Sequence, residues 1–365
     1  MERRTFVSGL SRIVAEAQRS LRAQVERVRV LACQTALDRG PPSALVDYHA
    51  LRLLVKHLSG DDVAFLRRSL GSPRIDLEEI RSQGEPSLFS HMLWVMALDR
   101  LWGQPMLRQV EYVLGAQSFK MELDLTCAPE CTYYAEDPTP SLTRLLRLGG
   151  EVLYDIGANV GFHALTGSMF FGESHAFEPT PQTLGRLRKN VAMNPARRVT
   201  VHGVGLSARD GQARLFVHEV HPGVNTLVSG PSATGGEAVD VSVFRLDNYR
   251  KAQALPGPSV IKIDVEGHEC EVLEGAQETI EAFRPTIFVE VQSMKMLEQF
   301  ANRLPRSYEL YSLPTRGALV PASLQAPFGR DHDFLFVDGA RRELLERRLS
   351  GSWTGSGPPE GDRPR

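Results

Sequence analysis

Cysteine is scarce in this chain, which has only Cys33, Cys127, Cys131 and Cys270 among its 365 residues. So few cysteines in so long a chain do not make a disulfide framework, and we expect reduced thiols. Cys127 and Cys131 are spaced more widely than a CxxC pair and have no second pair of ligands to complete a zinc site. The sequence therefore predicts no metal site.

An excess of one charge and long apolar runs are absent as well. The 42 Lys and Arg residues nearly balance the 44 Asp and Glu residues, so the composition does not favour binding to nucleic acid. No apolar run reaches the roughly 18 residues of a membrane-spanning helix. The basic start MERRTFVSGL leads into an Arg/Glu-rich stretch rather than the apolar core of a signal peptide. We expect a cytoplasmic globular protein with neither a membrane nor a nucleic-acid partner.

The N-terminal region, residues 1–108, has the pattern of helices. Apolar residues recur at intervals of three and four over 6–38, 43–58 and 61–70, which is typical of amphipathic helices. Residues 88–102 are apolar enough for a buried helix. The region contains no catalytic constellation. We interpret it as a cap or dimerisation module, through which the chain would form a homo-oligomer, or as a lid that selects substrate.

An α/β pattern dominates the rest of the chain. Residues 109–148 predict a β-rich lead-in followed by a helix over 138–148, and residues 149–338 alternate short β-branched runs with helical patterns. This alternation predicts a mostly parallel sheet covered by helices on both faces, ending in an antiparallel hairpin. The seven expected strands are 152–156, 175–178, 199–206, 260–264, 286–291, 308–313 and 333–337. Residues 339–365 are too poor in apolar residues to pack, so we expect a disordered tail.

The most informative segment is EVLYDIGANVG, residues 151–161, in which an apolar strand runs into an acid and a glycine-rich turn. A helix is expected to begin at Phe162. Gly157 and Gly161 have no Cβ, so the backbone can turn sharply and approach a ligand. The helix start presents unpaired N–H groups to an anionic group such as a carboxylate. The segment predicts a ligand site, with Asp155 beside it.

The next strand supports a nucleoside-containing ligand. It ends in Glu178, about twenty residues beyond the turn, where doubly wound folds place an acid on ribose hydroxyls. A dinucleotide fingerprint would require glycines at 157, 159 and 162, whereas the chain has Gly157, Asn159 and Phe162, with the next glycine at 161. This spacing favours a cofactor with an amino-acid tail over one with a pyrophosphate.

Candidate catalytic groups follow the fourth and fifth strands. Asp264 ends the fourth strand at the carboxyl edge of the sheet, where open α/β folds bind ligands, and Glu266 and His268 come directly after it. Asp264 is our first candidate for a base or substrate anchor, and His268 titrates near neutral pH. Glu266 has a second interpretation as the cap of the following helix. Lys262, two residues before Asp264, is expected to share its face and form an ion pair.

Three further positions complete the candidate set. Glu290 closes the fifth strand in PTIFVEVQ, and an acid in such an apolar run is costly without a partner. Asn225 lies in a Gly-, Ser- and Pro-rich stretch over 218–237 that is either a binding loop or a surface loop, and His332 precedes the last strand. We expect Asn225 and His332 to contact the substrate.

An ordered set of segments carries a resemblance to a known family. These are DIGANVG at 155–161, FEP at 177–179, GLSARDG at 205–211, LDNY at 246–249 and IKIDVEGHECEVLEGA at 261–276. With them, residues 149–338 resemble the FkbM-type S-adenosylmethionine-dependent methyltransferases. The resemblance implies a Rossmann-like class I methyltransferase fold with an inserted hairpin. It also implies methyl transfer to a hydroxyl oxygen of a small molecule, commonly a sugar or a natural-product scaffold.

The resemblance suggests roles for the residues already singled out. Gly157, Asn159 and Gly161 would hold the methionine portion of S-adenosylmethionine, Asp155 would accept a hydrogen bond from it, and Glu178 would bind the ribose. Ser207 would lie at the adenine edge, or else begin the Asp210–Gly211 turn. Because the sulfonium methyl is already activated, the enzyme needs to align the acceptor and accept its proton. Asp264, Glu266, His268 and Glu290 are the candidates for that work.

Two other classes of function remain as alternatives. A sensor that binds S-adenosylmethionine without catalysis would keep Asp155, Gly157 and Glu178 but would not need Asp264, Glu266 or Glu290. An NAD-dependent oxidoreductase would need the glycine pattern that the chain lacks. The presence of the acidic residues favours a methyltransferase.

Overall fold

The computed structural model describes residues 74–76, 107–124, 130, 140–217, 237–312, 319–324 and 333–350. The chain divides into two compact units. The first comprises Met1–Ile75, Glu79–Glu111 and Leu123–Glu136, and the second comprises Asp76–Glu78, Tyr112–Glu122 and Asp137–Arg365. The helices predicted within residues 1–108 lie outside the described residues, as do Asn225 and His332. The short strand β1 (Arg74–Asp76) is described.

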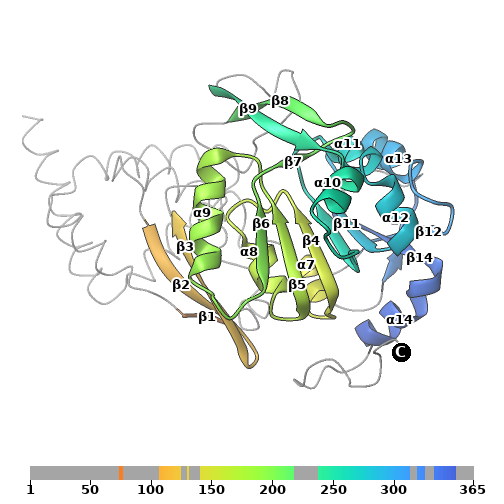
Figure 1. Ribbon diagram of the computed structural model, residues 1–365. Coiled ribbons are helices and arrows are strands. Elements are labelled where there is room, and N and C mark those ends of the chain that lie inside the picture. Colours follow the sequence, from red (N-terminus) through yellow and green to blue (C-terminus); the bar gives the residue numbers. More distant parts are fainter. Residues whose placement is uncertain are drawn as a thin grey trace, which may run out of the picture. The chain divides into compact units, whose positions relative to one another are not determined.

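The second unit is built on a large sheet with the order β13-β12-β14-β11-β10-β4-β5-β6 (Figure 1). Its strands are β4 (Gly150–Ile156), β5 (Phe171–Phe177), β6 (Val199–His202), β10 (Val260–Ile263), β11 (Thr286–Glu290), β12 (Tyr308–Ser312), β13 (Val320–Pro321) and β14 (Asp333–Asp338). Neighbours from β11 to β6 pair in parallel, whereas β14 is antiparallel to both β11 and β12. The mostly parallel α/β sheet and the terminal antiparallel pairing are thus confirmed. The chain reverses its direction of winding between β4 and β10, which is where such folds bind ligands.

The strand count differs from the prediction in two places. The described part of the sheet has eight strands instead of seven, because Val320–Pro321 adds a two-residue edge strand beside β12. The strand expected over 199–206 is also divided. Its last residues form β7 (Gly205–Leu206), which pairs with β9 in a separate sheet. Gly203 and Val204, between the two parts, belong to neither strand, and the chain leaves the large sheet there.

The separate sheet is the inserted hairpin implied by the family resemblance. Strands β8 (Gly211–Val217) and β9 (Glu237–Phe244) pair antiparallel, in the order β7-β9-β8. A second hairpin is formed by β2 (Leu107–Leu114) and β3 (Gln117–Asp124), within the segment expected to be rich in strands. Tyr112 and Phe119 of that hairpin stack on each other and contact Phe162 edge-on, so its middle part packs beside the glycine turn.

Helices cover the large sheet on both faces, as predicted. They are α7 (Pro140–Leu146), α8 (Phe162–Gly167), α9 (Pro181–Ala192), α10 (Leu246–Ala252), α11 (Glu269–Glu274), α12 (Gln277–Phe283), α13 (Met294–Ala301) and α14 (Gly339–Ser350). Successive strand side chains point to opposite faces. Tyr154, Ile156 and Ile261 therefore join an apolar cluster with α11 to α13, whereas Leu153 and Val260 join one with α7 and α14.

Two helix predictions need correction. The single helix expected from 269 to 283 is two helices. The backbone N–H groups of Glu278 and Thr279 donate to the Asp247 carboxylate, and the oxygens of Glu274 and Gly275 accept from the Arg245 guanidinium and Asp247 N. Polar groups distant in sequence therefore take the place of helical hydrogen bonds at this point. The disorder predicted from residue 339 is wrong for Gly339–Ser350, which form α14. Leu345 is buried there, and the Arg341 guanidinium donates to the backbone oxygens of Ser259 and Phe283.

None of the helices in the described part of the chain combines the length and the apolar character needed to cross a membrane.

Candidate functional site

The glycine turn follows β4 and adopts the left-handed backbone that its sequence predicts. Gly157, Asn159 and Gly161 have φ angles of 76°, 49° and 97°. A Cβ at Gly157 would lie 1.8 Å from the backbone oxygen of Asp264, so glycine is required there. The N–H groups of Gly157 and Ala158 donate to the Phe177 oxygen at 3.1 and 3.0 Å. The turn is therefore fixed between the ends of β5 and β10.

Glu178 lies beside this turn, as predicted. Its carboxylate is buried, and its Oε2 accepts a hydrogen bond from Asn159 N at 3.1 Å while Oε1 accepts one from Thr180 N at 2.8 Å. Burial raises the pKa of Glu178, and the two backbone donors oppose that rise. The acid thus joins the turn to the end of β5, and each oxygen keeps a lone pair for a further donor.

Asp155 has a partner that the sequence did not indicate. Its side chain is completely buried, and its Oδ1 lies 3.2 Å from Lys262 Nζ. Lys262 also donates to the Gly157 oxygen at 2.7 Å and lies 3.2 Å from Asp264 Oδ2. The predicted ion pair with Asp264 is confirmed. Direct contact of Asp155 with a cofactor stays a prediction, because in this structure its carboxylate is occupied by the lysine.

Asp264, Glu266 and Glu290 form an acid cluster at the carboxyl ends of β10 and β11. Glu266 has a left-handed backbone with φ of 53°, and its Oε2 accepts a hydrogen bond from Gln292 Nε2 at 3.0 Å. Burial, with the charges of Asp264 and Glu269, raises the pKa of Glu266 to about 7. The charge of Asp264, followed by burial and the charge of Asp333, raises the pKa of Glu290 to about 9. The structure thus brings together three of the four predicted catalytic residues.

The fourth, His268, lies at the start of α11 and contacts Ser207 rather than the cluster. Its Nε2 is 2.9 Å from Ser207 Oγ, and its Nδ1 is 3.7 Å from Glu271 Oε2. Burial lowers the pKa of His268. His268 occupies the N-cap position of α11, and no side chain makes a capping hydrogen bond there. Glu269 Oε1 instead accepts from Val265 N and Gly267 N in the preceding loop, so the capping interpretation of Glu266 is wrong.

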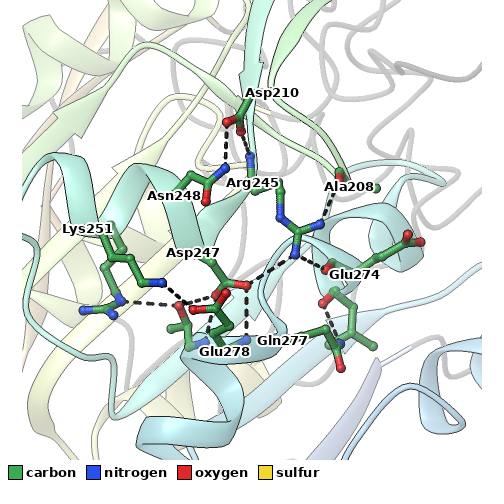
Figure 2. Close-up of polar contacts among 12 residues, drawn as sticks. Ala208, Asp210, Arg245, Asp247, Asn248, Lys251, Glu274, Gln277 and Glu278 are labelled. Carbon is green, nitrogen blue, oxygen red and sulfur yellow. Dashed lines mark hydrogen bonds and ion pairs between the residues drawn. The ribbon is translucent and has the colours of Figure 1, made fainter.

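A polar network fixes the loop that carries Ser207 (Figure 2). The Arg245 guanidinium donates to the Ala208 oxygen at 2.9 Å and to the Glu274 oxygen at 3.1 Å. The buried Asp247 carboxylate accepts from the backbone N of Glu278 at 3.1 Å and from the backbone N and the hydroxyl of Thr279 at 2.8 and 2.7 Å. Arg245 thus joins the Ser207 loop to the end of α11, and Asp247 of the LDNY segment holds the start of α12, so both support the contact between Ser207 and His268.

Two buried histidines form a second cluster, on the other face of the sheet, that the sequence reasoning did not find. His175 Nδ1 is 3.0 Å from His202 Nε2, and His202 Nδ1 is 3.2 Å from the Tyr249 hydroxyl. Burial, reinforced by His175, lowers the pKa of His202 to about 4. Both residues lie on neighbouring strands, so a register for β5 and β6 would have predicted their contact.

Metal ligation finds no support among the described residues, where no group of three His, Cys, Asp or Glu side chains is arranged to hold an ion.

Comparison with known proteins identifies the region that carries these residues. Residues 155–311 match the "Methyltransferase FkbM domain". The chain is 31% identical over 143 residues to the hexuronic acid methyltransferase AglP of Haloferax volcanii, covering 39% of this chain and 56% of that protein. It is 27% identical over 201 residues to the 2-O-methyltransferase NoeI of Sinorhizobium fredii, covering 49% and 79%.

Other relatives match similar portions. The methyltransferase sdnD of Sordaria araneosa is 30% identical over 156 residues, covering 34% of this chain and 60% of that protein. This chain spans somewhat more than half the length of several curated relatives that it matches. A solved FkbM methyltransferase from Methylobacillus flagellatus superposes with a TM-score of 0.37 at 19% identity, covering 72% of this chain and 57% of that one.

Proposed function

We propose, from the premise that residues 155–311 belong to the FkbM methyltransferase family, that this protein transfers a methyl group from S-adenosylmethionine to a hydroxyl oxygen of a small molecule. One juxtaposition carries the proposal. The glycine turn and Glu178 meet at the ends of β4 and β5, and the carboxylate of Asp264 follows the adjacent strand β10. This arrangement supports the proposal because the candidate nucleoside-binding groups lie close to a carboxylate of the acid cluster at the switch point of the sheet.

The donor fits the residues at the turn. Glu178 accepts hydrogen bonds from two backbone groups and would accept others from ribose hydroxyls. The backbone of Gly157, Asn159 and Gly161 would hold the amino-acid end, and Ser207 the adenine edge. Once bound, S-adenosylmethionine supplies an activated methyl group. Aligning the acceptor is then the main task left to the protein, and good alignment is worth effective molarities of about 10⁵–10⁸ M.

Glu266 is the best candidate for the base. A general base works best when its pKa lies near the working pH, and the pKa of Glu266 is raised to about 7. Asp264 is held by the Lys262 ammonium, so its carboxylate is better suited to anchoring a hydroxyl than to taking its proton. Glu290, with a pKa of about 9, is protonated at neutral pH and can donate a hydrogen bond to the acceptor.

The acceptor is proposed to be a sugar or a hydroxylated natural product. Two relatives support this class, since one is named for methylation of a hexuronic acid and another as a 2-O-methyltransferase. Asn225 and His332 remain candidates for contact with the acceptor. We also propose that the protein is cytoplasmic. For residues 1–108 we propose a role as cap, lid or dimerisation module.

Ligand binding and turnover test the function together. S-adenosylmethionine and S-adenosylhomocysteine should each raise the melting temperature, because a ligand at 100 times its Kd adds about 2.7 kcal/mol to the free energy of unfolding. NAD should leave it unchanged. With labelled methyl donor, a panel of glycosides, including uronic acids, should contain at least one substrate that gains label on oxygen.

The possible outcomes separate the alternatives. A melting temperature raised by NAD alone would contradict the methyltransferase proposal. Binding of both sulfur compounds without transfer to any member of a broad hydroxyl panel would favour a sensor.

A further inference from the structure

Lys262 lies where the cofactor strand and the acid cluster meet. It sits opposite Asp155 of β4 on one side and Phe288 of β11 on the other. Side chains two residues apart on a strand share a face, so Lys262 and Asp264 face the same way. The same rule puts Glu290 on the face of Phe288. One ammonium group therefore stands among acids from three adjacent strands.

The contacts of this lysine are close and shielded from solvent. Its side chain is 3% exposed, and Nζ lies 2.7 Å from the Gly157 oxygen, 3.2 Å from Asp155 Oδ1 and 3.2 Å from Asp264 Oδ2. A buried charge is costly unless it is paired and hydrogen-bonded. Two carboxylates and a carbonyl oxygen satisfy it here.

We propose that Lys262 is a positioning residue of the proposed active site, holding the glycine turn and the Asp264 carboxylate in one arrangement and supplying the positive charge that offsets the acid cluster. The inference rests on the proposed methyl transfer. In it, the buried Lys262 side chain couples the glycine turn, which would bind the methyl donor, to the acid cluster, which would bind the acceptor.

The mechanical part of the coupling follows from two contacts. Lys262 donates a hydrogen bond to the Gly157 oxygen. Gly157 also packs so closely against the Asp264 backbone that a Cβ at residue 157 would lie 1.8 Å from the Asp264 oxygen. The glycine turn and the Asp264 segment are thus in close backbone contact, and the Lys262 ammonium group binds both. A shift of either one moves the other.

The electrostatic part depends on every titratable group near the ammonium. These groups are Asp155 on β4, His163 on α8, Glu178 after β5, Asp264 and Glu266 after β10, Glu290 on β11 and, through Glu290, Asp333 on β14. The charge of Lys262 lowers the pKa of Glu266 and of Glu290, opposing the mutual repulsion of the acids. Without it, the proposed base would be protonated at a higher pH.

The test compares Lys262→Met and Lys262→Gln with the wild-type protein. Both variants lose the charge, but only Gln keeps a donor for the Gly157 oxygen. We expect the acid limb of the pH profile of kcat/KM to move to higher pH in both variants, because each loses the charge that lowers the pKa of Glu266. S-adenosylhomocysteine binding should weaken at least about tenfold in Lys262→Met and much less in Lys262→Gln. Lys251→Met, which removes an exposed partner of Glu278, is the matched control and should change neither quantity.

If folded Lys262→Gln has the acid limb of its kcat/KM profile at the same pH as the wild-type protein, the inference is overturned. If neither variant folds, Lys262→Met/Asp155→Asn removes both members of one buried pair, and an unmoved limb in that protein would overturn it equally. A wild-type protein that binds donor but transfers no methyl group would instead contradict the proposed function and, with it, this coupling. An active wild type with unchanged variants contradicts the coupling alone.

Discussion

At the residue scale, the three acids of the cluster differ because their surroundings differ. Asp264 Oδ2 lies 3.2 Å from the Lys262 ammonium. Glu290 faces the charge of Asp264 and is partly buried, so its pKa rises to about 9. Burial, with the charges of Asp264 and Glu269, raises the pKa of Glu266 to about 7. Two carboxyl groups whose pKa values differ in this way can serve as base and hydrogen-bond donor in one site, beside an acid held by an ammonium group.

Glu266→Gln should therefore lower kcat by about 10²-fold or more, the usual contribution of a general base. The acid limb near pH 7 should disappear, and the Kd for S-adenosylhomocysteine should stay within about twofold. Asp264→Asn should keep the limb but move it to lower pH, because the Asp264 charge raises the pKa of Glu266. The measurement is kcat and kcat/KM from pH 5 to 9, with Glu281→Gln on the exposed side of α12 as control. A Glu266→Gln enzyme that retains the limb would assign the base to another group.

The sequence indicated contacts within one strand but not contacts between residues distant in sequence. The pair Lys262–Asp264 follows from alternation within one strand, so it was predictable. The pair Lys262–Asp155 depends on the register between β4 and β10, which local patterns do not contain. Ser207 and His268 are 61 residues apart and meet only because Gly275 admits the Ser207 loop. Both were predicted as site residues, but their contact was not.

At the element scale, the turn after β4 depends on glycine for both backbone angle and space. Gly157→Ala combines a positive φ with a Cβ placed 1.8 Å from a backbone oxygen, so the turn must shift. We expect a loss of about 1–3 kcal/mol in the free energy of unfolding, the usual cost of such strain, together with much weaker binding of S-adenosylhomocysteine. Urea denaturation and calorimetry measure these two effects.

Gly185→Ala is the control for that substitution. A Cβ at Gly185, within α9, would meet nothing within 4 Å, and alanine is favoured over glycine in a helix by about 1 kcal/mol. This variant should be as stable as the wild type or more so, with unchanged binding. Wild-type stability and binding in Gly157→Ala would show that the turn is not constrained as described.

Elements were predictable where one apolar pattern decides them, and not where tertiary contacts do. The strands at 152–156, 260–264 and 286–291 match β4, β10 and β11 to within a few residues because apolar runs specify them. The break between α11 and α12 depends on polar groups distant in sequence. Helix α14 is rich in charge, but its Arg and Glu side chains pair along the helix and Leu345 is buried against the sheet. Disorder predicted from composition alone takes no account of these contacts.

At the scale of the second unit, two titrating clusters lie on opposite faces of the sheet and act on stability in opposite directions. The His202 pKa falls to about 4 in the folded protein from 6.5, so its contribution is present above 6.5 and is lost as the pH falls to 4. The Glu290 pKa rises to about 9 from 4.5, so its contribution is present below 4.5 and is lost as the pH rises to 9. Glu266 acts in the same direction up to about 7.

Between about pH 4.5 and 6.5 the loss from the two acids opposes the gain from His202, and above pH 6.5 only the acids change, so stability should fall from about pH 6.5 to pH 9. Glu290→Gln removes the largest cause of the alkaline fall, so its melting temperature should exceed that of the wild type by a margin that grows from pH 5 to 9. His202→Gln should remove the gain in stability between about pH 4 and 6.5 and leave the fall above pH 6.5 unchanged. Melting temperatures from pH 4 to 9.5 measure both effects. Parallel curves for wild type and Glu290→Gln would mean that Glu290 titrates like an exposed acid, and the cluster would lose its electrostatic basis.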